Sequence, residues 1–167
     1  MISLLLIQHY FQPLYSLYIK EAFTERFLVV DQNRMLRTTM DIRAATDFTF
    51  RPADKNIRFY LFVPATNMVL DQKGSSFEFN KVGVNSRVGG TSQKWKFVFN
   101  KFGSFTMISS TKKMIYDPRS DSFNMVPISS MLNNKGYILF DGTMTYFNQF
   151  SFPPLLNAMN QGYSLNK

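Results

Sequence analysis

The residues best suited to binding a charged ligand lie in one short stretch of the chain, residues 81–119. Eight Lys and Arg residues occur there with a single acidic residue, Asp117, and aromatic residues are interleaved with them. Basic side chains neutralise phosphates and aromatic rings stack on unpaired bases, so this composition is typical of a surface for RNA or another polyanion. The alternative interpretation is a solvated outer face of a small β-protein. The candidate RNA- or anion-binding residues are Lys81, Arg87, Lys94, Lys96, Lys101, Lys112, Lys113 and Arg119.

Residue types for most catalytic chemistry are scarce. The 167 residues include no cysteine and one histidine, His9. This excludes disulfide frameworks, cysteine nucleophiles, zinc sites built from Cys and His, and any Ser-His-Asp triad that does not use His9. The glutamates, Glu21, Glu25 and Glu78, show no ordering around a cleft. We therefore expect a binding protein that is not an enzyme and needs no metal or cofactor.

The first nineteen residues carry no charge, whereas the whole chain has a net charge of +8. Gln and Pro residues interrupt this apolar segment, so it fits neither a secretory signal nor a membrane span well. We expect residues 1–25 to form an apolar N-terminal extension that packs on the domain or enters a partner. The absence of cysteine favours the cytoplasm, and a cleaved signal with secretion is the alternative.

Short strand-like runs recur along the rest of the chain in three units, residues 26–56, 57–101 and 102–144. Each unit opens with an apolar run, continues with a second short run after a polar turn, and closes with an aromatic-rich run. Runs rich in β-branched and aromatic residues, separated by Gly, Asn, Pro and Ser, are typical of strands. The pattern predicts an all-β barrel or sandwich over residues 26–144, followed by an irregular strap over residues 145–167.

Two motifs of the second unit carry a resemblance to a known family. Val69-Leu70-Asp71 is followed by Gln93-Lys94-Trp95, and Ile115-Tyr116-Asp117 repeats the first motif in the third unit. These motifs resemble the ricin-type β-trefoil lectins, which repeat a Cys-Leu-Asp and Gln-x-Trp pattern three times. The resemblance covers residues 26–144 and implies a β-trefoil of three repeats.

The resemblance also implies where sugar would bind. The family's sugar-contacting aspartate falls on Asp71 and Asp117, whereas Arg37 takes that position in the first unit and Met35 the preceding cysteine position. Asp71 could instead cap a turn. The aromatic position of Gln-x-Trp is kept as Phe48 and Tyr137 in the outer units, where we expect core residues. The candidate carbohydrate-binding residues are Asp71, Phe79, Gln93, Asp117 and Asn133.

Two functions therefore compete. The clustered positive charge favours a basic β-trefoil that docks on RNA or a ribonucleoprotein assembly such as the ribosome. The alternative is a secreted ricin-type lectin. We expect no membrane span in either case.

Overall fold

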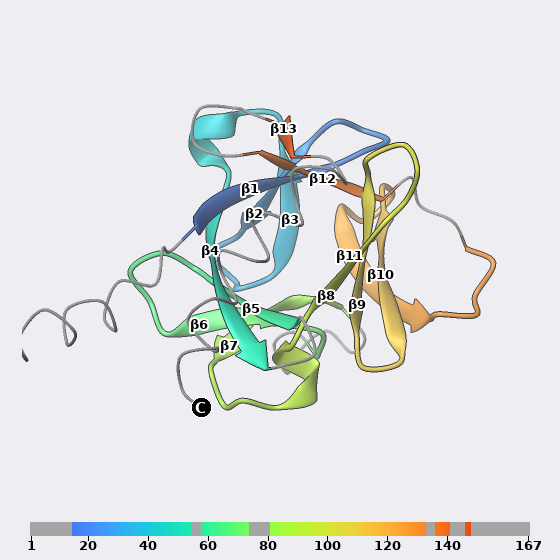
Figure 1. Cartoon of the computed structure of the whole chain (residues 1–167). Coiled ribbons are helices and arrows are strands. Elements are labelled where there is room, and N and C mark those ends of the chain that lie inside the picture. Colours follow the sequence, from blue (N-terminus) through green and yellow to red (C-terminus); the bar gives the residue numbers. More distant parts are fainter. Residues whose placement is uncertain (1–14, 55–57, 74–80, 133–135, 141–145, 148–167) are drawn as a thin grey trace, which may run out of the picture.

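The computed structural model describes residues 15–54, 58–73, 81–132, 136–140 and 146–147. These residues form short strands and two single-turn 3-10 helices, η1 (Ile42–Ala44) and η2 (Thr91–Gln93) (Figure 1). Within these ranges there is no helix with the length and apolar character needed to cross a membrane.

Six of the strands form a closed barrel. They are β1 (Tyr15–Glu21), β4 (Asp47–Asp54), β5 (Arg58–Phe62), β8 (Lys96–Phe99), β9 (Phe105–Ser109) and β12 (Tyr137–Phe140). Antiparallel pairing joins β5 to β4, β4 to β1, β1 to β12, β12 to β9 and β9 to β8. Phe59 and Trp95 close the ring, because their backbones exchange two hydrogen bonds of 2.8 and 2.9 Å. A short strand, β13 (Tyr146–Phe147), pairs with β12.

Three hairpins extend from the barrel, one in each unit. They are formed by β2 (Phe27–Val30) with β3 (Leu36–Thr39), β6 (Met68–Asp71) with β7 (Gly83–Ser86), and β10 (Lys112–Asp117) with β11 (Ser122–Pro127). Met35 forms a β-bridge to Gly83, and Lys81 forms one to Asn124, so the second hairpin contacts both others. A six-stranded barrel with three such hairpins is a β-trefoil, which confirms the predicted all-β fold class.

The threefold pattern is clearest in the barrel core. Phe48, Trp95 and Tyr137 are fully buried and lie opposite Leu17, Phe59 and Phe105 on the neighbouring strands. The expectation that the aromatic position of the Gln-x-Trp pattern belongs to the core is therefore confirmed. Burying a large apolar side chain contributes roughly 1.5–3 kcal/mol, which explains why a small barrel carries so many phenylalanines.

The first unit begins earlier than we predicted. Residues 15–21 form barrel strand β1, with Leu17 and Ile19 buried on the core side, whereas we had assigned residues 1–25 to an extension. Residues 26–30 consequently contribute the hairpin strand β2 rather than the opening strand of the unit. The structural units are residues 15–54, 58–99 and 105–140. The rest of the predicted extension, residues 1–14, and most of the predicted strap lie outside the described residues.

Candidate functional site

An aspartate ends the first hairpin strand in every unit. Asp31 follows β2, whereas Asp71 and Asp117 are the last residues of β6 and β10. Each carboxylate accepts a hydrogen bond from the backbone N–H two residues further on, at 2.8, 2.9 and 3.0 Å respectively. This is the Asx-turn geometry. All three aspartates therefore cap a turn, and in each of them this capping bond uses a single carboxylate oxygen.

The placement of Arg37 and Met35 at the family's Asp and Cys positions was wrong. Arg37 lies in β3, the second strand of the first hairpin, and Met35 directly precedes that strand. Because β1 is the first strand of the unit, the run 34–37 that we matched to the first hairpin strand is in fact the second one. The residues equivalent to Val69 and Asp71 are Val29 and Asp31. The aspartate of the pattern is thus present in all three units.

Asp71 differs from the other two aspartates in its side-chain partners. Its Oδ2 accepts a hydrogen bond from Nε2 of Gln93 at 3.1 Å and one from Nδ2 of Asn85 at 3.4 Å. Asp71 is only 5 % exposed, so these amides hold a nearly buried carboxylate in one orientation. The structure thus brings together Asp71 and Gln93, two of the five candidate carbohydrate-binding residues, and adds Asn85 from β7.

The Gln93 side chain is fixed by three further hydrogen bonds, which involve both of its polar atoms. Its Oε1 accepts the backbone N–H groups of Val88 and Gly89 at 2.9 and 3.2 Å, and its Nε2 donates to the Ser86 carbonyl at 2.9 Å. Two residues later, the indole N–H of Trp95 donates to the Leu70 carbonyl at 3.0 Å. Gln93 therefore ties the segment after β7 to the carboxylate that ends β6.

The equivalent carboxylates have partners of another kind. Asp31 forms an ion pair with Arg37 at 3.2 Å, and Asp117 accepts a hydrogen bond from the Ser120 hydroxyl at 2.8 Å. The hydrogen bonds from Ser120 and from the Arg119 backbone lower the pKa of Asp117. Asp117 lies in the third unit and does not share a site with Asp71. Phe79 and Asn133, the other candidate carbohydrate-binding residues, lie outside the described residues.

The predicted basic residues do not converge on one site. Arg87 is exposed, and its guanidinium lies over the Tyr60 ring at 5.1 Å from the centroid. Lys94 lies 3.7 Å from Asp54, and Lys81 is in the bridge between hairpins. Arg119 is in the β10–β11 turn. The remaining four, Lys96, Lys101, Lys112 and Lys113, lie on or beside strands β8–β10.

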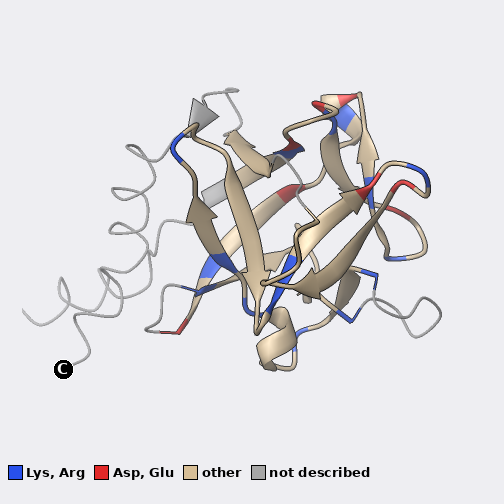
Figure 2. Cartoon of the chain, turned by 90° about the vertical axis from the view of Figure 1, so that its right-hand side faces the viewer, with Lys and Arg blue, Asp and Glu red and all other residues tan. Residues whose placement is uncertain are grey.

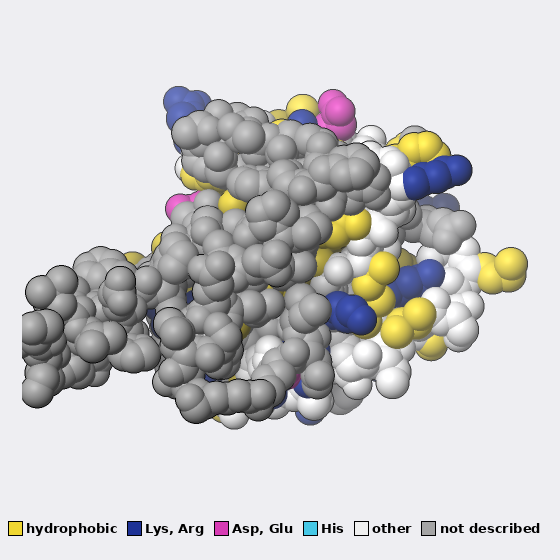
Figure 3. All heavy atoms as spheres, in the orientation of Figure 1, with side chains coloured by type: hydrophobic (Ala, Val, Ile, Leu, Met, Phe, Trp, Pro, Cys, Tyr) yellow, Lys and Arg dark blue, Asp and Glu magenta, His cyan; other side chains and the backbone are white. Residues whose placement is uncertain are grey.

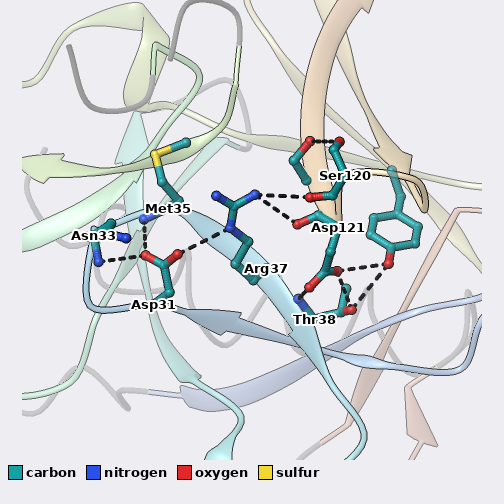
Figure 4. A network of polar contacts seen from close by, with 9 residues as sticks. Asp31, Asn33, Met35, Arg37, Thr38, Ser120 and Asp121 are labelled. Carbon is teal, nitrogen blue, oxygen red and sulfur yellow. Dashed lines mark hydrogen bonds and ion pairs between the residues drawn. The ribbon is translucent and has the colours of Figure 1, made fainter. Parts of the chain in front are cut away.

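A polar network joins the first and third hairpins (Figure 4). The carboxylate of Asp121 accepts hydrogen bonds from the Thr38 hydroxyl at 2.6 Å and the Tyr116 hydroxyl at 2.9 Å, and Arg37 donates to the carbonyls of Ser120 and Asp121. Burial acts to raise the pKa of Asp121, but the hydrogen bonds from Thr38 and Tyr116 outweigh it, and the net shift is downward. The second hairpin contacts both others through β-bridges, and this network supplies the side-chain contacts between the first and third hairpins. Its role is to hold these two hairpins together. In the described part of the chain there is also no cluster of His, Cys, Asp and Glu suited to a metal ion.

Comparisons with known proteins establish similarity of fold. No protein-family model and no curated protein matches the sequence. Among solved structures, a designed threefold-symmetric protein, ThreeFoil, matches with a TM-score of 0.58 and 18 % identity over 75 % of this chain and 98 % of its own. A GH43 β-1,3-galactosidase matches with a TM-score of 0.62 and 15 % identity over 88 % of this chain. A GlcNAcα1-4Gal-releasing endo-β-galactosidase from Clostridium perfringens matches with a TM-score of 0.58 and 9 % identity over 75 %.

These comparisons contradict the expectation that the chain is not an enzyme, because two of the similar structures are galactosidases. The chain spans 32 % of the length of each of those two proteins. What the likeness establishes is the shared β-trefoil fold.

Proposed function

We propose that this chain is a ricin-type carbohydrate-binding β-trefoil with its site centred on Asp71 in the second unit. The observation that carries the proposal is the hydrogen bond from the Gln93 side-chain amide to the Asp71 carboxylate. It joins the two motifs on which the resemblance to the ricin-type lectins rests. In the first and third units, the described partners of the equivalent aspartates are an arginine and a serine instead.

The chemistry of the Asp71 carboxylate suits a polyhydroxylated ligand. An ionised carboxylate only accepts hydrogen bonds, and hydroxyl groups bound to it form short, strong ones. Among the described residues, its Oδ1 accepts one hydrogen bond, from the Lys73 backbone N–H at 2.9 Å, and a carboxylate oxygen can accept a second one from a sugar hydroxyl. Gln93 and Asn85 fix the other oxygen, so the carboxylate loses little freedom when a ligand binds.

The kinds of protein among the similar structures support a carbohydrate ligand for this chain in preference to RNA. Two of the similar structures are galactosidases, and none of the similar proteins named above is a nucleic-acid-binding protein. Galactosides are therefore the first ligands to test. The eight basic residues are divided among several surfaces, which weakens the RNA interpretation, and RNA binding remains a prediction. Secretion, the location that goes with a lectin, is likewise part of this proposal.

Binding to a glycan array followed by calorimetry with the best galactoside tests the proposal. Asp71→Asn removes the negative charge at nearly constant volume and should weaken binding by about tenfold or more, because hydrogen bonds to charged groups are the strong ones. Asp31→Asn is the matched control, since it changes the equivalent residue of the first unit, and should leave affinity unchanged. Product formation followed in the same samples shows whether the bound glycan is also cleaved. Equal affinity of the Asp71→Asn variant and the unchanged chain contradicts the proposed site.

A further inference from the structure

The outward side of strands β8–β11 carries basic and apolar side chains together, and we call it the β8–β11 face. One row of directly opposed residues crosses the four strands: Lys96, Ile108, Lys113 and Val126. Opposed residues of antiparallel strands project to the same side of a sheet. Ile108 therefore lies between two lysines, and the buried neighbours Phe97, Met107 and Met114 point to the other side.

Large apolar side chains are also exposed in β8, in the β8–β9 turn and in the segment after β11. Val98 is 42 % exposed on β8 and Phe102 is 80 % exposed in the β8–β9 turn. After β11, Ile128, Met131 and Leu132 are exposed as well, with Met131 at 94 %. Lys113 Nζ donates to the Ser130 carbonyl at 2.7 Å, which anchors this segment beside β10. Figure 3 shows hydrophobic and basic side chains interspersed on this side of the molecule.

The charge of the face has one sign. Residues 96–116 contain four lysines and no acidic residue. Lys112 adjoins Lys113 in β10 and projects to the other side of the sheet, so the lysines of the row itself are Lys96 and Lys113. The acidic residues nearest in sequence, Asp117 and Asp121, are in and around the turn at the far end of β10. Figure 2 views the molecule from the right-hand side of Figure 1 and shows basic residues on the strands and turns there, with acidic residues at several neighbouring positions. Exposed apolar side chains that lie together with positive charge are typical of an interaction surface.

We infer that the β8–β11 face binds an anionic lipid surface, with Phe102, Met131 and Leu132 entering the boundary between headgroups and acyl chains. Lysines near such a surface are attracted to the anionic headgroups, and apolar side chains gain free energy by leaving water. RNA fits less well, because its recognition uses rings that stack on bases, and Phe102 is the one strongly exposed aromatic residue in the stretch 96–132. The inference is independent of the Asp71 site.

Flotation of the full chain with lipid vesicles tests this inference. Vesicles of phosphatidylcholine alone are compared with vesicles that also contain phosphatidylserine, at low and high salt. We expect binding to the second kind only, weakened by salt because headgroup attraction is screened. Lys96→Glu with Lys101→Glu should reduce partitioning by at least about 30-fold, at about 1 kcal/mol for each lysine lost. Phe102→Ser with Met131→Ser should reduce it by about tenfold or more.

The matched control is Arg34→Glu with Arg43→Glu, which changes the net charge equally but lies in the first unit, away from the face. Its partitioning should stay within a fewfold of the unchanged chain. All of the substituted side chains are exposed, so thermal unfolding should show that every variant is folded. Absence of vesicle binding, binding that does not depend on phosphatidylserine, or an equal loss in the control overturns the inference. Capture of single-stranded RNA that is lost in the lysine variant, without vesicle binding, also overturns it and supports an RNA surface instead.

Discussion

Gln93 donates a hydrogen bond from its side-chain amide to the carboxylate of Asp71 across 3.1 Å, although 22 residues separate them in the chain. The bond connects the end of β6 to the 3-10 turn before β8, so it spans the second unit from its hairpin to its last barrel strand. In the same unit, the Trp95 indole reaches back to the Leu70 carbonyl. The second unit is thus held by two parallel contacts between consecutive sequence motifs.

Replacing Gln93 should weaken both the fold and any sugar binding. Gln93→Ala removes the fully buried acceptor of the Val88 and Gly89 N–H groups and one of the two amide donors to Oδ2 of the nearly buried Asp71. Each unsatisfied group costs about 1–3 kcal/mol, so we expect a loss of about 2–4 kcal/mol in unfolding free energy. Chemical denaturation measures it. An unchanged unfolding free energy would show that the amide network does not stabilise the unit.

Gly89 and Gly136 have similar φ angles, but replacing each by alanine should lower the unfolding free energy by different amounts. Gly136 has φ +84, and a Cβ there would lie 2.7 Å from the Phe105 carbonyl oxygen. Gly89 has φ +78, but its Cβ would meet the Tyr60 hydroxyl at an ordinary 3.5 Å. Gly89→Ala should cost about 1–2 kcal/mol from backbone strain alone. Gly136→Ala should cost about 3 kcal/mol or more, because the clash with fixed backbone adds to that strain. Equal midpoints of thermal unfolding for the two variants would contradict the predicted close contact.

The Asp121 network should make stability depend on pH in the acidic range. The folded state lowers the pKa of Asp121, so the ionised form stabilises the fold above the ordinary aspartate pKa. This stabilisation should decline as the pH falls from about 5 toward the lowered pKa. Asp121→Asn tolerates the positive φ of 44° and removes the titration. The difference in unfolding free energy between the two proteins should therefore be largest near neutral pH and shrink on acidification. A difference that stays constant with pH would contradict this role.

Trp95→Phe should destabilise the barrel by about 2 kcal/mol. The change removes the hydrogen bond to the Leu70 carbonyl and leaves part of a fully buried site unfilled. Trp95 is the single tryptophan, so its fluorescence follows unfolding directly in the unchanged chain. The Trp95→Phe variant has no tryptophan, so its thermal unfolding is followed by circular dichroism. A thermal midpoint equal to that of the unchanged chain would show that the site repacks without cost.

The sequence was sufficient to predict the trefoil and to name Asp71 and Gln93 among the candidate carbohydrate-binding residues, but it did not predict the hydrogen bond between them. The strands of the second and third units have clear boundaries, and a single Gln-x-Trp tripeptide marks where a unit closes. The first barrel strand was missed because the whole uncharged segment before Lys20 was assigned to an extension, although Pro13 interrupts it just before β1 begins at Tyr15. Because β1 was missed, we assigned residues 26–30 to the opening barrel strand, although they form the first hairpin strand. Asp31, which follows this strand, was therefore not matched to Asp71 and Asp117.

The surface was harder to predict, because strand pairing decides which side chains share a face. Lys94 and Lys96 are two residues apart, yet Lys94 lies near Asp54 while Lys96 lies opposite Ile108. Asn85 reaches Asp71 only through the register of β6 and β7, in which it lies opposite Val69. Composition alone could not distinguish these environments.

The most direct test of the central claim is a nuclear magnetic resonance titration of the isotope-labelled chain with a β-galactoside. The account predicts that the side-chain amide signals of Gln93 and the backbone amide signal of Lys73 shift with one common dissociation constant, and that Asp71→Asn abolishes these shifts while Asp31→Asn preserves them. Saturable shifts that leave Gln93 and Lys73 unchanged, or shifts that persist unaltered in Asp71→Asn, would contradict a carbohydrate site at Asp71.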